Sequence, residues 1–295
     1  LFAATYAPMT AAGKINPEII KDYSEFLRNN KIQGVFINGS TGDFVSLGFQ
    51  ERNQLLEKWA LEKPSELYLI NHVGSNNLLE AQAMAEFSKD KADAIAAIAP
   101  FYFVPNNMEL LLDYCVAIAE KAPNLPFFYY HLPALTGANF NMTKFSDLAK
   151  TRIPNFKGIK FTENNVVEFQ KLNSSHEELD VFFGVDEAFI SSLALNAKGW
   201  VGSTYNQLSP LYHAIEKAFS NNDLKEANRL QSLAITFVET LAGMGGFNGA
   251  GKSFMKSLGL DMGPSRYPHV TLNDGQLQEV RKKFEVLGLD SFFSK

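Results

Sequence analysis

The chain alternates eight short apolar runs with longer amphipathic stretches, and this alternation restricts its fold more than any other feature of the sequence. Short, mostly apolar runs are typical of strands that are covered on both faces. The run at residues 94–98 is the weakest strand candidate, because it is rich in alanine and poor in β-branched residues. We predict strands at Phe2–Tyr6, Gly34–Asn38, Leu67–His72, Ala94–Ile98, Phe127–Tyr130, Gly158–Phe161, Val181–Phe183 and Trp200–Gly202.

The stretches between these runs carry apolar residues at helical spacing. The first begins with Asn16 as a predicted N-cap and Pro17 at the first helical position, and continues with Ile19, Ile20 and Tyr23. The other helices predicted between the runs or after the last of them are Gln50–Glu62, Leu78–Lys89, Met108–Lys121, Thr143–Lys150, Asn165–Asn173, Glu187–Asn196 and Pro210–Phe219.

A strand followed by a helix, eight times over, predicts a parallel sheet with right-handed crossovers, and the count matches an α/β (β/α)₈ TIM barrel. A doubly wound open sheet is the structural alternative. No G-x-G-x-x-G motif follows the first strand, which weakens the dinucleotide-binding form of that alternative. We predict that residues 1–222 form the barrel with the active site, and that 223–295 form a C-terminal helical extension packed on it. Its predicted helices are Leu224–Leu241, Lys252–Leu258 and Gln276–Leu287.

Composition excludes several classes of partner. The chain has 27 Lys and Arg against 32 Asp and Glu, a net charge of −5, so bulk charge would not bind a nucleic acid. No apolar run reaches the roughly 18 residues that cross a bilayer, and no targeting segment is visible, so we expect a cytoplasmic protein without a membrane partner. Cys115 is the only cysteine, and the five histidines lack metal-ligand spacing, so we expect no metal site.

The segment from Gly246 to Ser253 fits G-x-x-x-x-G-K-[ST], the pattern of a phosphate-binding P-loop. A P-loop lies between a strand and a helix. Here the preceding stretch is strongly helical, and the segment follows the eight strand–helix units. We therefore interpret it as a glycine-rich turn between two helices.

Active sites of barrel enzymes lie at the carboxyl ends of the strands, and Lys160 is the most informative residue at such an end. It lies within the apolar run from Phe156 to Phe161, although lysine is disfavoured in strands and costly to bury unpaired. A buried lysine can supply a neutral amine, the nucleophile that forms a Schiff base with a carbonyl. The alternative is that Lys160 marks the strand end and extends its amine to solvent.

Three other strand ends carry polar residues that suit chemistry. Ser40 and Thr41 lie in a tight glycine-flanked turn whose amides and hydroxyls suit a carboxylate or phosphate. Tyr130 could act as a general acid or base, and Asp186 with Glu187 could bind sugar hydroxyls. Each also has a structural interpretation: an ordinary turn, a core aromatic, and an N-cap with a first-turn acid.

Together these motifs resemble the dihydrodipicolinate synthase/N-acetylneuraminate lyase superfamily of class I aldolases, along essentially the whole chain. The resemblance implies that Lys160 forms a Schiff base with a 2-oxo acid, that Tyr130 moves a proton, and that Ser40 and Thr41 hold the carboxylate of pyruvate. It also implies a homotetramer and no cofactor. The motifs that carry it are Gly39-Ser40-Thr41-Gly42, Tyr130-x-x-Pro133, Gly158-Ile159-Lys160 and Gly202-Ser203.

Within that superfamily the chain resembles the N-acetylneuraminate lyases. Leu135 stands where the synthases carry an arginine for the carboxylate of their semialdehyde substrate. The resemblance implies reversible cleavage of N-acetylneuraminate, a sialic acid, to pyruvate and N-acetylmannosamine. Asp43 and His131 depart from the usual pattern, and His131 could perturb Tyr130. The residues that would hold the sugar's polyhydroxyl tail are Thr162, Gly184, Asp186, Glu187 and Ser203.

Two alternatives remain open. The first is a lyase or synthase of the same superfamily that acts on another 2-oxo acid, such as a dihydrodipicolinate synthase with an unusual pocket. The second is a catalytically silent sugar-acid-binding barrel, which the presence of both Lys160 and Tyr130 disfavours.

Overall fold

The computed structural model describes residues 1–295 and has the predicted (β/α)₈ fold, a closed barrel of eight parallel strands in chain order. All eight predicted strands are present, and the alanine-rich run is a strand with the predicted bounds. The strands are β1 (Phe2–Ala4), β2 (Gly34–Ile37), β3 (Tyr68–His72), β4 (Ala94–Ile98), β5 (Phe127–His131), β6 (Phe156–Phe161), β7 (Asp180–Phe183) and β8 (Gly199–Gly202).

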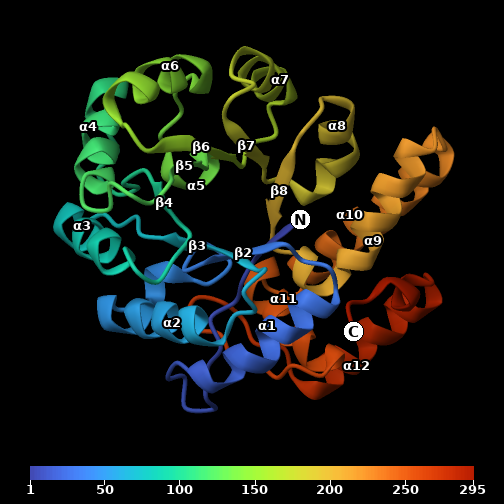
Figure 1. Cartoon of the computed structure of the whole chain (residues 1–295). Helices are drawn as coiled ribbons and strands as arrows, with labels where there is room; N and C mark the ends of the chain where they lie inside the picture. Colours follow the sequence, from blue (N-terminus) through green and yellow to red (C-terminus); the bar gives the residue numbers. More distant parts are fainter. The chain divides into compact units, whose positions relative to one another are not determined.

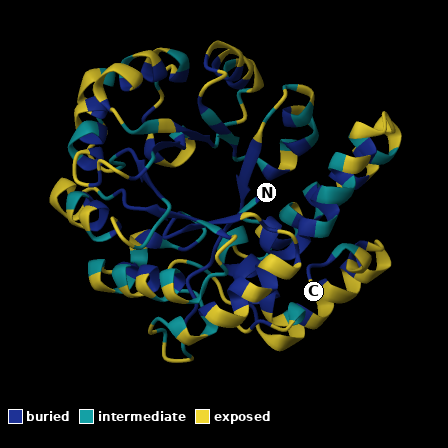
Figure 2. Ribbon diagram, in the orientation of Figure 1, coloured by how far each residue is buried: buried dark blue, intermediate teal, exposed yellow.

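The predicted strand ends differ from the observed ones for local reasons. β2 ends one residue early because Asn38 takes a left-handed backbone conformation, with φ of 56°, and starts a turn. β6 begins two residues earlier than predicted, because Phe156 already pairs with Phe127 before a bulge in that ladder. The burial colouring in Figure 2 shows strands mostly dark blue, while the exposed residues gather on helices and loops.

By its internal packing the chain divides into two compact units. The first unit comprises residues 1–68, 186–193 and 202–295, and the second comprises 69–185 and 194–201. A division at residue 222 therefore stays a prediction.

In the second unit, helices follow β3, β4, β5 and β6. Asparagine side chains cap four of them, at Asn77, Asn107, Asn141 and Asn165, and satisfy amides that a helix start leaves free. The short helix α5 was not predicted; Pro133 stands at its first turn and Gly137 ends it with φ of 69°. The helices are α3 (Leu78–Phe87), α4 (Met108–Ala119), α5 (Pro133–Thr136), α6 (Met142–Arg152) and α7 (Val166–Ser175).

In the first unit one predicted helix start is confirmed and another is wrong. Pro17 is the first residue of the short 3₁₀ helix η1 (Pro17–Ile19), which runs directly into α1 (Ile20–Asn29), and Asn16 stands at the N-cap position, although its side chain makes no capping hydrogen bond. Helix α9 (Tyr205–Ser220) begins five residues before Pro210 and is kinked at Leu208. The other helices of this unit's barrel portion are η2 (Phe44–Ser46), α2 (Phe49–Glu62), η3 (Asp186–Ala188) and α8 (Phe189–Ala194), whose last residue lies outside the unit.

The C-terminal helices of the first unit pack around buried phenylalanines. Helix α10 lies along α9 (Figure 1), and Phe237 on α10 contacts Phe254 and Phe284, whose rings also contact Phe293. No helix of the chain combines the length and apolarity that crossing a membrane requires. These helices are α10 (Leu224–Ala242), α11 (Phe247–Phe254), η4 (Met255–Leu258), α12 (Asp274–Val286) and η5 (Leu289–Phe292).

The P-loop-like segment is helical. It follows helix α10 rather than a strand, as the sequence indicates, so the P-loop context is missing. It is not the turn that we predict, however, because residues 247–254 form α11, and the only break from α10 is the short stretch ending at Gly246, with φ of 104°.

Candidate active site

Lys160 and Tyr130 face each other at the carboxyl ends of β6 and β5. They are direct partners in the strand ladder. The Lys160 Nζ lies 3.9 Å from the centroid of the Tyr130 ring, and the two residues are 5% and 3% exposed. A cation over an aromatic face is electrostatically attracted to it. The amine is therefore held inside the second unit rather than extended to solvent, which excludes the alternative interpretation of Lys160.

Strand alternation explains why this pair faces inward. The residues two positions earlier on the two strands, Phe128 and Gly158, point to the same face and are apolar or small. Phe128 packs on Phe182, with ring centroids 5.4 Å apart. At Gly158 a Cβ would lie 2.0 Å from the Asp180 carbonyl oxygen, so only glycine lets β7 approach β6 there. Lys160 thus lies one layer above an apolar floor, at the end where chemistry occurs in this fold.

His72 supports the pair from β3. Its ring meets the Tyr130 ring edge-on, with centroids 5.9 Å apart. Its Nε2 accepts a hydrogen bond from the Ile98 amide, 3.2 Å away. An acceptor at Nε2 requires the tautomer with its proton on Nδ1. The sequence did not reveal this role, because a histidine that ends an apolar strand is more often an ordinary core residue.

Thr162 and Gly184 form the second polar group of this unit. A Cβ on Gly184 would lie 2.2 Å from the Thr162 Oγ1, so the hydroxyl occupies the space that any other residue would need. This oxygen is buried and has no hydrogen-bond partner. A buried hydroxyl without a partner is costly, which makes Thr162 a candidate for binding a ligand.

His131 turns away from Tyr130. Successive strand residues point to opposite faces, and the His131 ring lies against Phe161, with its Nε2 3.1 Å from a Glu163 carboxylate oxygen. Burial lowers the pKa of His131 to about 4, although the charge of Glu168 opposes the shift. The ring is therefore neutral near pH 7 and adds no charge beside the Lys160–Tyr130 pair.

In the first unit, Ser40 and Thr41 lie in the tight turn after β2, residues 39–42, which we call the β2 turn. Its flanking residues Asn38 and Asp43 both have left-handed φ angles, of 56° and 52°. The Ser40 carbonyl accepts hydrogen bonds from the Asp43 amide, at 3.0 Å, and from the Asn248 side chain on α11, at 2.9 Å. The Thr41 hydroxyl is half-buried and bonds no other group. The turn is thus fixed while a hydroxyl stays available.

Asp186 anchors the end of β8. Its Oδ2 accepts hydrogen bonds from the amide and the hydroxyl of Thr204, at 2.9 and 2.6 Å. A Cβ on Gly202 would lie 1.8 Å from the Asp186 Oδ1. The Thr204 hydroxyl also lies 2.7 Å from the Tyr212 hydroxyl, so this buried carboxylate ends a chain of hydrogen bonds. Asp186 therefore has a structural task in addition to any ligand.

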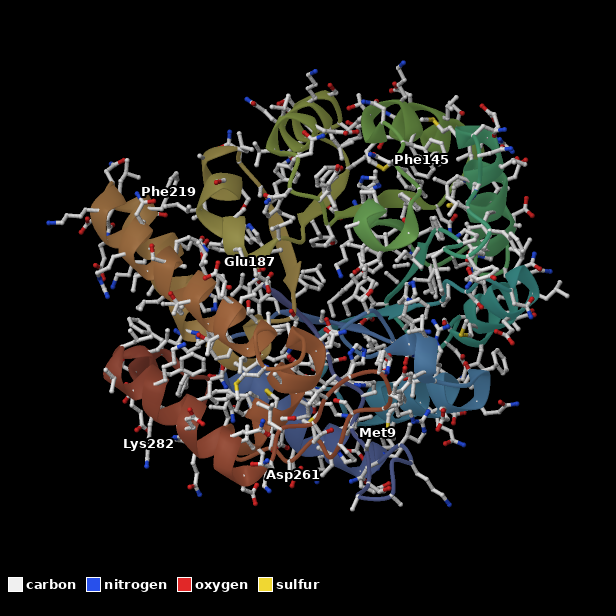
Figure 3. The ribbon with its side chains drawn as sticks, turned by 180° about the vertical axis from the view of Figure 1, so that it is seen from behind. Met9, Phe145, Glu187, Phe219, Asp261 and Lys282 are labelled. Atoms are coloured by element: carbon white, nitrogen blue, oxygen red, sulfur yellow. The ribbon has the colours of Figure 1, made fainter.

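Glu187 and Ser203 are open to ligands. Glu187 (Figure 3) is exposed and its side chain bonds no other residue, and Ser203 is half-buried with a hydroxyl that bonds no other group. Although the residue as a whole is exposed, neighbouring atoms partly desolvate its carboxylate, and this desolvation and then the charge of Asp186 raise the pKa of Glu187.

The predicted site residues thus fall into two sets. The second unit brings Lys160 against Tyr130 and Thr162 against Gly184, and the first unit holds Ser40, Thr41, Asp186, Glu187 and Ser203. Sequence reasoning missed Asn248, whose only signal was its place in the P-loop-like segment. No group of three or more acidic, histidine or cysteine side chains could hold a metal ion.

A (β/α)₈ barrel with a buried lysine on its sixth strand, covered by a tyrosine from the fifth, defines the class: a barrel built for covalent chemistry at a lysine amine. The model of the dihydrodipicolinate synthetase family matches residues 1–287, and the chain belongs to that family.

Named relatives are similar along almost the whole chain. The N-acetylneuraminate lyase of Gallus gallus is 38% identical over 291 residues, covering 97% of this chain and 94% of that protein. That of Rattus norvegicus is 37% identical, covering 91% and 86%. The structure of the Proteus mirabilis N-acetylneuraminate lyase matches with a TM-score of 0.92 at 31% identity, covering 97% of each chain.

Proposed function

We propose that this protein is an aldolase that cleaves N-acetylneuraminate reversibly to pyruvate and N-acetylmannosamine. The observation that carries the proposal is the buried amine of Lys160 over the ring of Tyr130. Relatives in animals and bacteria that carry the name of this activity support the choice of substrate.

The proposed reaction begins when the neutral Lys160 amine attacks the C2 carbonyl of the open-chain sugar acid, and water leaves to give a protonated imine. Tyr130 relays the C4 hydroxyl proton as the C3–C4 bond breaks: its phenol oxygen takes that proton while its own proton passes to the substrate carboxylate, with Ser40 or Thr41 in the relay. The electrons of that bond flow into the imine, which becomes an enamine, and C4 becomes the aldehyde of N-acetylmannosamine. Protonation of the enamine at C3 and hydrolysis then release pyruvate and restore the amine.

The remaining residues are proposed to bind the two ends of the substrate. The available hydroxyl of Thr41, with Ser40, suits the carboxylate. The hydroxyls of Thr162 and Ser203 and the carboxylate of Glu187 suit a polyhydroxyl tail, because they are donors and acceptors with no other partner. We propose that Asp186 and Gly184 complete this second group, Gly184 by leaving room for the Thr162 hydroxyl.

Leu135 favours a sugar acid over an aspartate-derived semialdehyde as the substrate. It lies on α5 and is 68% exposed, and an apolar side chain offers a carboxylate neither charge nor hydrogen bond. A synthase that receives an aspartate-derived semialdehyde would need a cation for that carboxylate.

The decisive experiment measures pyruvate released from N-acetylneuraminate, with aspartate semialdehyde plus pyruvate as the competing reaction. Pyruvate release without condensation supports the proposal. Condensation without release would identify a synthase, and neither reaction would identify a silent binding barrel. Borohydride reduction in the presence of pyruvate should then label one peptide, the one that contains Lys160.

Lys160→Ala should abolish both the label and turnover. Lys157→Ala is the matched control, because Lys157 lies on the same strand but is exposed and pairs with Asp180 at 3.4 Å. A label on another lysine, or turnover that survives Lys160→Ala, would overturn the mechanism.

We also propose that the protein acts as a homotetramer in the cytoplasm. Tyr102 and Phe103 are 78% and 87% exposed, and the Asn76 side chain fixes their loop by accepting hydrogen bonds from the amides of Phe101 and Tyr102. A rigid, exposed aromatic loop is typical of an interface. Light scattering should give four times the chain mass, and Phe103→Glu should lower it; a monomer at micromolar concentration would contradict the proposal.

A further inference from the structure

A groove of about 540 Å³ lies in the first unit, and none of the residues that the proposed reaction uses lines it. Its floor is formed by buried residues, among them Met9, Lys252 and Leu272, and its rim includes Asn16, Lys256 and Asp261. Figure 3 labels Met9 and Asp261, two of the residues that line it. We call this feature the Lys252 groove.

Lys252 is a buried cation without a counter-ion. It is 6% exposed, and its Nζ donates one hydrogen bond, to the Pro264 carbonyl at 2.7 Å. An ammonium has three donors, so two remain for another partner. Burying a charge without a partner is costly, and burial lowers the pKa of Lys252 to about 8.

The other charged groups near Lys252 are already satisfied or lie farther away. Arg266 binds both carboxylate oxygens of Glu51, and Lys256 pairs with Asp274 at 2.7 Å. Asp43 and Asp261 attract the Lys252 charge without forming an ion pair with it, and Arg266 repels it. Of the three cations, only Lys252 lacks a carboxylate within 4.0 Å.

The groove also offers a neutral side-chain amide and a second lysine beside the Lys252 charge. The side chain of Asn16 caps no helix and lines the groove with Lys252. Lys252 and Lys256 are four residues apart on a continuous helical stretch, the spacing that places two side chains on one face. A compact oxyanion fits this groove. The groove offers it space, the spare donors of a buried ammonium, a lysine on the rim and a free amide.

We propose that the Lys252 groove binds a small oxyanion, a phosphate or a carboxylate, mainly through Lys252 on its floor. Lys256 on its rim makes the smaller contribution, because it also pairs with Asp274. The bound anion supplies the counter-ion that the fold leaves out. Phosphate and carboxylate oxygens share this chemistry, because both accept charge-assisted hydrogen bonds from an ammonium.

The test is calorimetric titration at pH 8 and constant ionic strength, with sulfate as the probe for a phosphate and acetate as the probe for a carboxylate. Neither probe changes its own protonation at this pH. The tighter probe identifies the class of anion. Because an anion favours the charged amine, binding should take up as much as about half a proton per chain, measured as a dependence of the heat on the buffer's ionisation enthalpy.

Variants separate the groove from the general charge of the surface. Lys252→Met keeps the aliphatic length and should weaken the tighter probe at least tenfold, while Lys256→Gln should weaken it about two- to threefold. Lys282→Gln on α12 is the control, because it removes the same charge from an exposed residue outside the groove.

The absence of saturable binding would overturn the proposal, and so would equal affinity in the Lys252→Met and Lys282→Gln variants. If Lys252→Met does not fold, proton uptake by the unaltered chain and the Lys256→Gln titration decide the question. None of these readouts depends on catalysis, so failure here leaves the proposed aldolase activity untouched.

Discussion

Replacing Thr162 with valine should make the protein more stable and less active at once. The Thr162 hydroxyl oxygen is buried without a partner, and removing such a group gains about 1–2 kcal/mol. The new methyl group must lie against Gly184, where a Cβ would come within 2.2 Å of the present oxygen. That crowding costs a few tenths of a kcal/mol or more, so the net gain should be about 1 kcal/mol.

The same change removes a hydrogen bond that we propose for the sugar's hydroxyl tail. Losing one such bond lowers kcat/KM for N-acetylneuraminate about three- to tenfold. Formation of the Schiff base with pyruvate, trapped by borohydride, should be unchanged, because pyruvate has no tail.

Thr162→Ser is the matched control, since it keeps the hydroxyl and loses the methyl. It should be about 1 kcal/mol less stable than the unaltered chain and retain most of its kcat/KM. Urea unfolding and steady-state kinetics on the three proteins provide both quantities. A valine variant that is less stable than the serine variant, or that keeps full kcat/KM, refutes the reasoning.

Three further predictions follow from the geometry. Asn248→Ala should free the carbonyl of the β2 turn and raise the KM for pyruvate in the synthetic direction several-fold, with a smaller change in kcat; equal effects on both would contradict a role in binding. The folded pKa of His131, about 4, lies below its ordinary 6.5, so the stability that its neutral form gives is complete above pH 6.5 and declines as the pH falls toward 4. Between pH 7 and pH 5 the free energy of urea unfolding should therefore fall by about 2 kcal/mol more in the unaltered chain than in His131→Gln. Equal falls in the two proteins would contradict the lowered pKa of His131. Gly202→Ala should cost about 2 kcal/mol or more, because its Cβ would strike the Asp186 carboxylate, whereas Gly48→Ala, whose Cβ would meet nothing closer than 3.8 Å, should cost far less in the same assay.

The barrel could be predicted from the sequence because its strands are buried on both faces. Burial on both faces makes each strand a compact apolar run, and the helices between them show a different period. The ends of elements escaped prediction where a single backbone angle or bond sets them. The left-handed φ of Asn38 stops β2, and the kink at Leu208 lets α9 start before Pro210; neither leaves a mark in hydrophobic periodicity.

The candidate site was predictable where a residue contradicts its surroundings. Lys160 is a charge in an apolar run, and the structure gives the reason in the ring of Tyr130. Asn248, by contrast, is an ordinary polar residue in its local sequence. It contacts the β2 turn from a helix more than 200 residues further along the chain, and such a contact depends on the tertiary fold alone.

Gly184 and Gly202 are intermediate between a site residue that the sequence reveals and one that it does not. Gly184 and Gly202 each end or follow a strand, and from sequence each indicates only that something approaches the backbone closely. In both, the approaching atom is a side-chain oxygen of a predicted site residue, Thr162 Oγ1 for the first and Asp186 Oδ1 for the second. The missing Cβ is what allows these oxygens to lie where they do. A glycine at the carboxyl end of a barrel strand can therefore be as specific to the site as the polar residue beside it, and substituting either glycine displaces an oxygen that we propose binds the substrate before it disturbs the strand.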